Sequence, residues 1–468
     1  MSSEIMAPLM FAALVLFLLL GYPVAFSLAA NGLLFAVIGI ANGLLTVDLL
    51  GALPARIYGI MQNETLLAIP FFTFMGLILE KSGLAEDLLD TIGQLFGPLR
   101  GGLAYAVILV GAMLAATTGV VAASVISMGL ISLPIMLRYG YDRRFASGVI
   151  AASGTLAQII PPSLVLIVLA DQLGKPVGEM YQGAMLPGLV LTALYAAYVL
   201  AMSIARPDFA PALPPAARTL RGGALLAKVL FALVPPLGLI FLVLGTIYLG
   251  WATPTESGAM GAVGALILAV ANRRLNASLL KQAMDTTTKL SSFVLFILIG
   301  STVWSLIFRA VNGDLWVEGL LTALPGGALG FLIVVNLLVF VLAFFLDFFE
   351  LAFILVPLLA PVAHKLGIDL VWFGVLLAIN MQTSFMHPPF GFALFYLRSV
   401  APKEEYTDKV TGQRTPGVTT GQIYWGAMPF VLIQIVMVVV VLVFPQLVGT
   451  QTEQAEEATP LRIELPAE

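Results

Sequence analysis

The chain has 468 residues, of which 60% are hydrophobic and only 10% are charged, and its formal net charge is −4. Soluble globular proteins contain about a quarter charged residues, so this composition excludes both a water-soluble fold and intrinsic disorder. The apolar runs are long and unbroken, which disfavours a β-barrel porin, so we expect an all-α polytopic membrane protein.

The rare residue types narrow the chemistry further. There is no cysteine, which excludes disulfides and cysteine-ligated metals, and the only histidines are His364 and His387, too few for a histidine-rich metal site. A nucleotide-binding loop is absent, because Gly174-Lys175 is followed by proline rather than by Ser or Thr. An ion gradient is therefore the expected energy source. The spans contain no paired aspartates, Ser-His dyad or HExxH motif, which argues against an intramembrane enzyme.

The apolar segments are long enough for membrane-spanning helices, which need about 20 residues each. No Lys or Arg precedes the first segment, which begins at Ile5, so we expect a retained first helix rather than a cleaved signal peptide. The segments lie at 5–21, 24–41, 64–82, 104–137, 144–171, 179–205, 223–249, 251–271, 286–309, 328–363, 371–399 and 422–448.

Two of these segments, 104–137 and 328–363, fit neither one crossing nor two. About 35 helical residues reach roughly 50 Å, whereas the hydrocarbon core is about 30 Å thick. Each segment carries a break at its middle, Thr117-Thr118-Gly119 in the first and Asp347-Phe348-Phe349-Glu350 in the second. We interpret both as re-entrant helical hairpins, because irregular backbone at that depth is tolerated only inside protein or beside water.

The charge distribution agrees with two hairpins and ten full crossings. One side of the membrane then receives only 5 of the 22 Lys and Arg residues, and the other side receives the remaining 17. By the positive-inside rule the richer side is cytoplasmic. Both termini, including the acidic tail at 450–468, are then expected to face outward, on the non-cytoplasmic side.

A shift of 227 residues superposes residues that shape helix ends. Under this shift Pro98, Pro134, Gly140, Asp142 and Pro161-Pro162 fall on Pro325, Pro361, Gly367, Asp369 and Pro388-Pro389. We expect two repeats, 1–205 and 223–449, joined by a cytoplasmic linker at 206–222. Each repeat holds five crossings and one hairpin, so the second enters the membrane from the opposite side, as in inverted-topology repeats. The alternative is a generic bundle with chance proline matches.

A second kind of break follows each hairpin, near the middle of spans 144–171 and 371–399. The first holds Ser153-Gly154-Thr155, Gln158 and Pro161-Pro162-Ser163, and the second holds Asn380, Gln382, Thr383 and Ser384, then His387-Pro388-Pro389. Paired prolines free carbonyl oxygens, which suit a monovalent cation together with hydroxyl and amide groups, while half-helix N-termini favour an anion. The alternative is helix packing through small polar side chains.

Three ionisable residues lie deep in the apolar runs. Asp347 and Glu350 are expected to bind a cation, take up a proton or orient the hairpin tip, since intramembrane carboxylates are costly and usually functional. The alternative is that a water-filled vestibule solvates them. His387 is a candidate contact for a substrate carboxylate or a pH sensor, or else a histidine packed at the break.

These features resemble the large membrane (M) subunit of TRAP transporters, the tripartite ATP-independent periplasmic transporters, over residues 1–450. The motifs that carry the resemblance are Ala68-Ile69-Pro70-Phe71-Phe72 with Gly76, Gly140-Tyr141, Ile160-Pro161-Pro162-Ser163, Thr253-Pro254-Thr255-Glu256 and Leu366-Gly367-Ile368. The chain departs from many relatives at the first hairpin tip, which is poorer in Ser, and at His387, where relatives often have Thr. Its Asp-Phe-Phe-Glu tip resembles a subgroup linked to 2-oxo acids, lactate and other organic acids.

The resemblance implies an elevator-type transporter with a scaffold and a mobile transport domain. It implies no cofactor beyond coupling sodium ions, with one sodium near Thr117–Gly119 and Ser153–Thr155 and a second near Asp347–Glu350 and Asn380–Ser384. The substrate is expected near Gln158, Pro161, Pro162, Ser163, His387, Pro388 and Pro389. The implied partners are a small four-helix membrane subunit and a periplasmic substrate-binding protein.

The leading functional hypothesis is the permease subunit of a sodium-coupled uptake system for small organic acids. The alternative is a self-sufficient sodium- or proton-coupled carboxylate symporter of the wider ion-transporter group. Dependence on a binding protein separates the two, because the second would transport without one.

Overall fold

The computed structural model describes residues 3–408 and 410–449, apart from the side chains of Ser3, Glu4, Thr117 and Thr118, and the regular structure of this part is almost entirely helical. The predicted acidic tail at 450–468 lies outside the described residues. The helices are α1 (Ser3–Leu19), α2 (Val24–Ala41), α3 (Leu53–Met61), α4 (Glu64–Lys81), α5 (Leu84–Phe96), α6 (Gly102–Thr118), α7 (Val121–Arg138), α8 (Arg143–Thr155), α9 (Leu164–Leu173), α10 (Val177–Ala205), α11 (Gly222–Tyr248), α12 (Pro254–Ala271), α13 (Ala277–Ala310), α14 (Gly313–Thr322), α15 (Gly327–Leu342), α16 (Phe348–Ile354), α17 (Val356–Lys365), α18 (Leu370–Gln382), α19 (Phe392–Val400) and α20 (Thr420–Val443). One short antiparallel pair, β1 (Tyr406–Thr407) with β2 (Arg414–Thr415), lies between α19 and α20.

The lengths and composition of the helices fit a membrane protein. Within the described residues, seven single helices are long and apolar enough to cross a bilayer, or up to ten spans when each bent helix pair counts as one. The bent pairs are α3 with α4, α14 with α15, and α16 with α17. The predicted fold class, an all-α polytopic membrane protein, is confirmed.

The first predicted hairpin is formed by α6 and α7, which pack against each other. The chain reverses at Gly119, whose φ of +58° is left-handed and therefore favours glycine. The second hairpin is formed by α15 and a return leg that bends by 52° between α16 and α17. Its first leg, α15, packs on α18.

Both predicted breaks are also present, and the shift of 227 residues relates their geometry. After α8 come a 3-10 turn at Leu156–Gln158 and a cis Pro161-Pro162 bond, and after α18 come a 3-10 turn at Thr383–Phe385 and a cis Pro388-Pro389 bond. Shifting the residue numbers of α8 by 227 gives the first and last residues of α18. The same shift applied to α7 gives the first residue of α16 and the last residue of α17.

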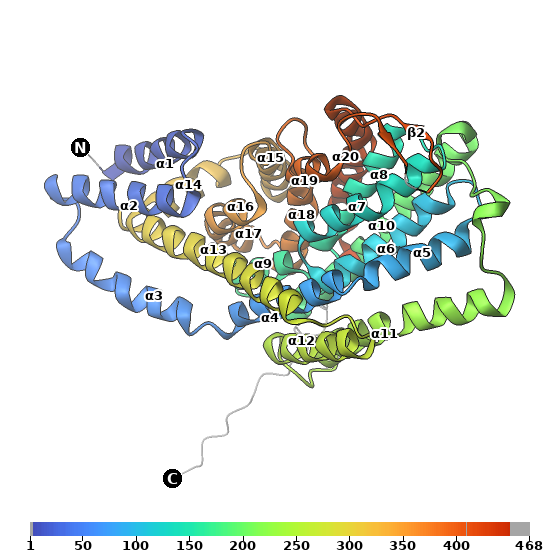
Figure 1. Cartoon of the computed structure of the whole chain (residues 1–468). Coiled ribbons are helices and arrows are strands. Elements are labelled where there is room, and N and C mark those ends of the chain that lie inside the picture. Colours follow the sequence, from blue (N-terminus) through green and yellow to red (C-terminus); the bar gives the residue numbers. More distant parts are fainter. Residues whose placement is uncertain (1–2, 409, 450–468) are drawn as a thin grey trace, which may run out of the picture.

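Elements from the two halves of the chain interlock. The most extensive packing joins α4 with α12, α2 with α13, and α8 with α20 (Figure 1). The approach of α8 to α20 is close because glycines face each other: a Cβ on Gly148 would lie 2.1 Å from the Gly426 carbonyl oxygen. The second half of each broken helix packs on the return leg of the other hairpin, α9 on α16 and α17, and α19 on α7.

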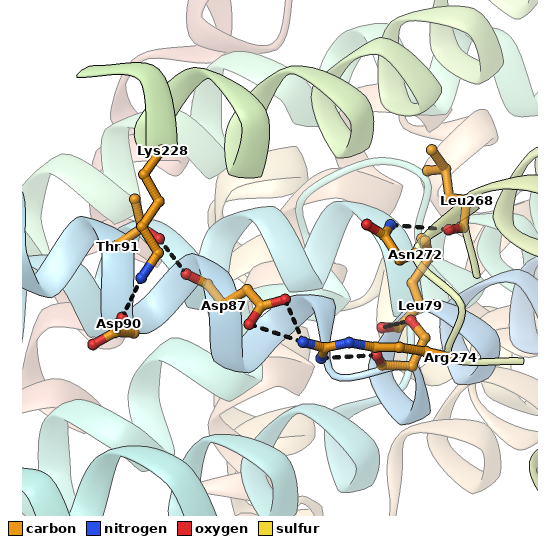
Figure 2. Close-up of polar contacts among 9 residues, drawn as sticks. Leu79, Asp87, Asp90, Thr91, Lys228, Leu268, Asn272 and Arg274 are labelled. Carbon is orange, nitrogen blue, oxygen red and sulfur yellow. Dashed lines mark hydrogen bonds and ion pairs between the residues drawn. The ribbon is translucent and has the colours of Figure 1, made fainter. Parts of the chain in front are cut away.

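Several elements outside the long apolar runs were not predicted, namely α3, α5, α14 and the β1–β2 pair. Among them, α5 carries acidic residues that hold it to the ends of α11 and α12 (Figure 2). Arg274 contacts Asp87 at 2.8 Å and donates to the Ser82 carbonyl, and Lys228 contacts Asp90 at 2.7 Å. These side chains are about half exposed, so each ion pair contributes only modestly to stability.

The end of α7 is tied to the β1–β2 segment by a better-buried ion pair. Arg138 Nε lies 2.9 Å from the Asp408 carboxylate, which is almost inaccessible to solvent and also accepts from the backbone N–H groups of Val410 and Thr411. Burial raises the pKa of Asp408, but the hydrogen bonds from Thr411 and Arg138 outweigh burial and lower it to about 2.

The segment 206–222, predicted as a linker, is held against the first hairpin by backbone hydrogen bonds. The N–H groups of Gly101 and Asp142 donate to the carbonyls of Ala210 and Phe209, and the N–H of Leu213 donates to Gly97. The linker therefore has a defined path from α10 to α11.

Candidate functional site

A cavity of about 400 Å³ lies where the two hairpin tips face the first break. Its walls come from the first tip, the first break, α13, the second tip, and the region from the second break into α19. The lining residues are Gly119, Val120, Val121, Ala122, Gln158, Leu164, Val165, Leu290, Phe293, Asp347, Phe348, Phe349, Glu350, Phe385, Phe392 and Tyr396. The structure therefore brings together four of the predicted site residues, Gly119, Gln158, Asp347 and Glu350.

Asp347 and Glu350 form a reciprocal capping box at the start of α16. The Glu350 N–H donates to Asp347 Oδ1 at 3.0 Å, and the Asp347 N–H donates to Glu350 Oε2 at 3.0 Å. This arrangement satisfies donors that are unpaired in the first turn of a helix and sets the direction of the return leg. One of the predicted roles, orientation of the hairpin tip, is thus visible in the geometry, and both side chains also face the cavity.

At the first break, the predicted residues lie against the legs of the first hairpin. Ser153 is buried against Gly111 of α6, and Gly154 is so close to Val125 of α7 that an added Cβ would lie 2.3 Å from a methyl carbon. Gly119, at the tip, lies instead beside Leu164, beyond the proline pair. The side chains of Thr117 and Thr118 lie outside the described part of the chain.

The hydroxyl groups at both breaks donate to their own helices. Ser153 and Thr155 donate to the carbonyls of Val149 and Ala152 at 2.6 and 2.8 Å. In the second break, Thr383 and Ser384 donate to Asn380 and Met381, both at 2.6 Å. Since the hydroxyl proton is used in each case, the lone pairs of these buried oxygens remain as acceptors.

Asn380 is held by a residue that was not predicted from the sequence. Its Nδ2 donates to the backbone carbonyl of Asn336 at 2.7 Å and to the side-chain Oδ1 of Asn336 at 2.9 Å. Asn336 lies on α15, the first leg of the second hairpin, and is buried. A lone amide within an otherwise apolar run was the available signal.

A buried polar contact joins the two breaks directly. Gln382 Nε2 donates to Thr155 Oγ1 at 3.1 Å, and these two residues are related by the 227-residue shift. Tyr195 on α10 lies within hydrogen-bonding reach of Thr155 and accepts from Gln434 on α20 at 2.9 Å. Tyr195 and Gln434 were not predicted, because they lie outside both breaks.

Of the predicted substrate residues, only Gln158 lines the cavity; Pro161, Pro162, Ser163, His387, Pro388 and Pro389 do not. Ser163 donates to the Gln158 carbonyl and so closes the first break on itself. His387 is 1% exposed and stacks on Phe344 at 4.2 Å, with Phe340 edge-on at 4.5 Å. This environment agrees with the alternative that His387 is packed at the break.

Known proteins resemble this chain over most of its length. The large permease protein DctM of a C4-dicarboxylate TRAP transporter from Pseudomonas aeruginosa is 30% identical over 411 residues, covering 86% of this chain and 91% of that protein. The ectoine/5-hydroxyectoine TRAP transporter large permease protein UehC from Ruegeria pomeroyi is 28% identical and covers 94% and 97%. The sialic acid TRAP transporter large permease protein SiaM from Vibrio cholerae is 26% identical and covers 91% and 93%.

The fold is shared with a solved transporter of distant sequence. The crystal structure of the Alcanivorax borkumensis YdaH transporter, described as having an unusual topology, superposes with a TM-score of 0.59 at 16% identity, covering 86% of this chain and 90% of that one. The family model of the DctM component of the tripartite ATP-independent periplasmic transporters matches residues 11–447. The predicted family is thereby confirmed: this chain is an integral membrane protein and belongs to the DctM family of TRAP transporter large permeases.

Proposed function

We propose that this chain is the permease subunit of a sodium-coupled, binding-protein-dependent transporter that imports small organic acids by elevator-type alternating access. The observation that carries the proposal is the cavity of about 400 Å³ between the two hairpin tips and the first break. A solute site enclosed by discontinuous helices is the arrangement expected of a secondary transporter. The names of relatives, which include a C4-dicarboxylate and a sialic acid permease, support an acidic solute.

The coupling ions would be sodium. The buried hydroxyl oxygens of Ser153 and Thr383, backbone carbonyls near the proline pairs and the carboxylates of Asp347 and Glu350 are hard oxygen atoms of the kind that suits this ion. One ion would use the first break around Ser153–Thr155 with the first hairpin. The other would use the second hairpin tip with Asn380–Ser384.

The proposed partners are a small membrane subunit and a periplasmic substrate-binding protein that delivers the solute. The relative named isethionate TRAP transporter permease protein DctMQ supports an association with a second membrane component, because this chain covers only 62% of its length. The proposed location is the bacterial inner membrane, with both termini in the periplasm.

The test is solute uptake in proteoliposomes that contain this chain and its small membrane subunit. The sodium gradient and the binding protein are each supplied or omitted, and candidate organic acids are screened in parallel. Uptake that requires both supports the proposal. Sodium-driven uptake without the binding protein would favour the self-sufficient symporter, and uptake without sodium would refute the coupling.

A further inference from the structure

The cavity between the hairpin tips has an unusual charge balance for a site that accepts organic acids. Its sixteen lining residues, all within the described part of the chain, include the carboxylates of Asp347 and Glu350 but no Lys, Arg or His. A solute carboxylate therefore finds no basic side chain to pair with among these residues. The two acidic side chains offer no positive charge to a solute carboxylate either.

The walls of this cavity are aromatic on both sides. Phe293 and Phe349 meet edge to face at 6.1 Å on the side of α13 and the second tip. On the side of the second break and α19, Phe392 lies 6.2 Å from Phe385 and 6.4 Å from Tyr396. Such surfaces favour a flat apolar body and leave a charged group without hydration.

The start of α16, which carries both acidic side chains of the cavity, is poorly suited to an anion. Two N–H groups at this helix start are already used by its own acidic side chains, since the Glu350 N–H donates to Asp347 and the Asp347 N–H donates to Glu350. An incoming carboxylate could use these two N–H groups only by displacing a bond. Among the sixteen described lining residues, the only uncharged side chains that can form hydrogen bonds are those of Gln158 and Tyr396.

From this lining we propose that the permease takes monocarboxylic acids with an apolar or aromatic body and discriminates against C4-dicarboxylates. The inference rests on the proposed function, because the single solute carboxylate is neutralised by a coupling sodium ion rather than by a side chain. A second carboxylate would lie against phenyl rings, which leave a charged group without hydration. The proposed solute therefore differs from the C4-dicarboxylate in the name of the Pseudomonas aeruginosa relative.

The test measures binding to the permease itself, so that the selectivity of the binding protein does not enter. The chain is purified with its small membrane subunit into nanodiscs, and radiolabelled phenylacetate, succinate and glycine betaine are titrated in sodium and in potassium buffer. We expect phenylacetate to bind at least tenfold more tightly than succinate in sodium, and its binding to be lost in potassium. Equal or tighter binding of succinate would overturn the proposal, as would glycine betaine binding best.

A matched set of variants ties the selectivity to this cavity. Phe349→Leu keeps an apolar side chain and should weaken phenylacetate binding severalfold while sparing any residual succinate binding. Phe241→Ala removes a ring that is 73% exposed on α11, outside the cavity, and should change neither. Equal effects of both variants would refute the cavity as the site. If no probe binds but the complex takes up another acid with sodium, the solute class is wrong and the proposed function stands. If no acid is taken up with sodium, the proposed function itself fails.

Discussion

The sharpest prediction concerns the two carboxylates at the second hairpin tip, because their structural role can be separated from their charge. Each accepts one backbone N–H at 3.0 Å within the capping box of α16. Asparagine caps helices about as well as aspartate, and glutamine can replace glutamate in a capping box. Asp347→Asn and Glu350→Gln therefore keep both hydrogen bonds and remove only charge.

The expected magnitudes differ between the two kinds of substitution. Asp347→Ala removes the cap and should lower the free energy of unfolding by about 1 kcal/mol. The amide variants should change stability by less than that. If the carboxylates hold sodium, losing one charged contact costs roughly 1.5–3 kcal/mol, and a tenfold change in affinity corresponds to about 1.4 kcal/mol. The half-saturating sodium concentration should then rise on the order of tenfold to a hundredfold.

The assay is solute uptake in proteoliposomes as a function of external sodium, with thermal unfolding of the same preparations as the check on folding. The matched control is Glu256→Gln. Glu256 closes an equivalent capping box with Thr253 at the start of α12, where the Thr253 N–H donates to Glu256 Oε2 at 2.8 Å, and it does not line the cavity. Unchanged sodium dependence in both Asp347→Asn and Glu350→Gln would mean that these side chains act only as helix caps, and would refute their role in coupling.

Three further predictions concern packing, acid stability and orientation. Gly148→Ala should destabilise the protein by about 1–3 kcal/mol, because the new Cβ would lie 2.1 Å from a carbonyl oxygen of α20. A Cβ added at Gly238 would meet no atom within 4 Å, so Gly238→Ala should be neutral or stabilising in the same thermal assay. The folded-state pKa of Asp408 is about 2, below its ordinary value of about 3.9. Its contribution to stability is therefore complete above about pH 4 and disappears as the pH falls through 2. Asp408→Asn should flatten the dependence of the melting temperature on pH in that window, and an unchanged dependence would contradict the ion pair. Since the chain has no cysteine, Arg273→Cys and Lys175→Cys can each be labelled alone, and an impermeant maleimide added outside intact cells should modify only the second.

The hairpins and broken helices could be predicted because their signals are local. A segment of about 35 apolar residues with a polar middle has few stable arrangements in a bilayer, and a proline pair interrupts a helix wherever it occurs. The observed limits agree within a few residues, since the first hairpin runs from Gly102 to Arg138 and the second from Gly327 to Lys365. Amphipathic α5 and α14 were not predicted, because both lie outside the long apolar runs.

The arrangement of the site could not be predicted in the same way, because it depends on which segments pack together. We expected each tip to lie beside the break of its own repeat, and Gly119 does lie beside Leu164. The contact of Gln382 with Thr155 and the packing of α9 on α16 join different repeats, and no spacing within one repeat encodes them. His387 stands beside a proline pair, yet its ring is enclosed by Phe340 and Phe344.

The cavity is asymmetric although the backbone repeats, because the two tips differ in sequence. The shift of 227 residues places Val120 and Ala123 at the positions of Asp347 and Glu350, so one tip contributes apolar surface and the other contributes both charges. Because α9 packs on α16 and α17 while α19 packs on α7, each tip is supported by a broken helix of the opposite repeat. The two tips therefore share a framework but differ in chemistry, and a change of charge at the second tip has no equivalent at the first. This difference is the reason that the effect of Asp347→Asn is expected on sodium dependence, whereas substitutions at Val120 should act through the shape of the cavity alone.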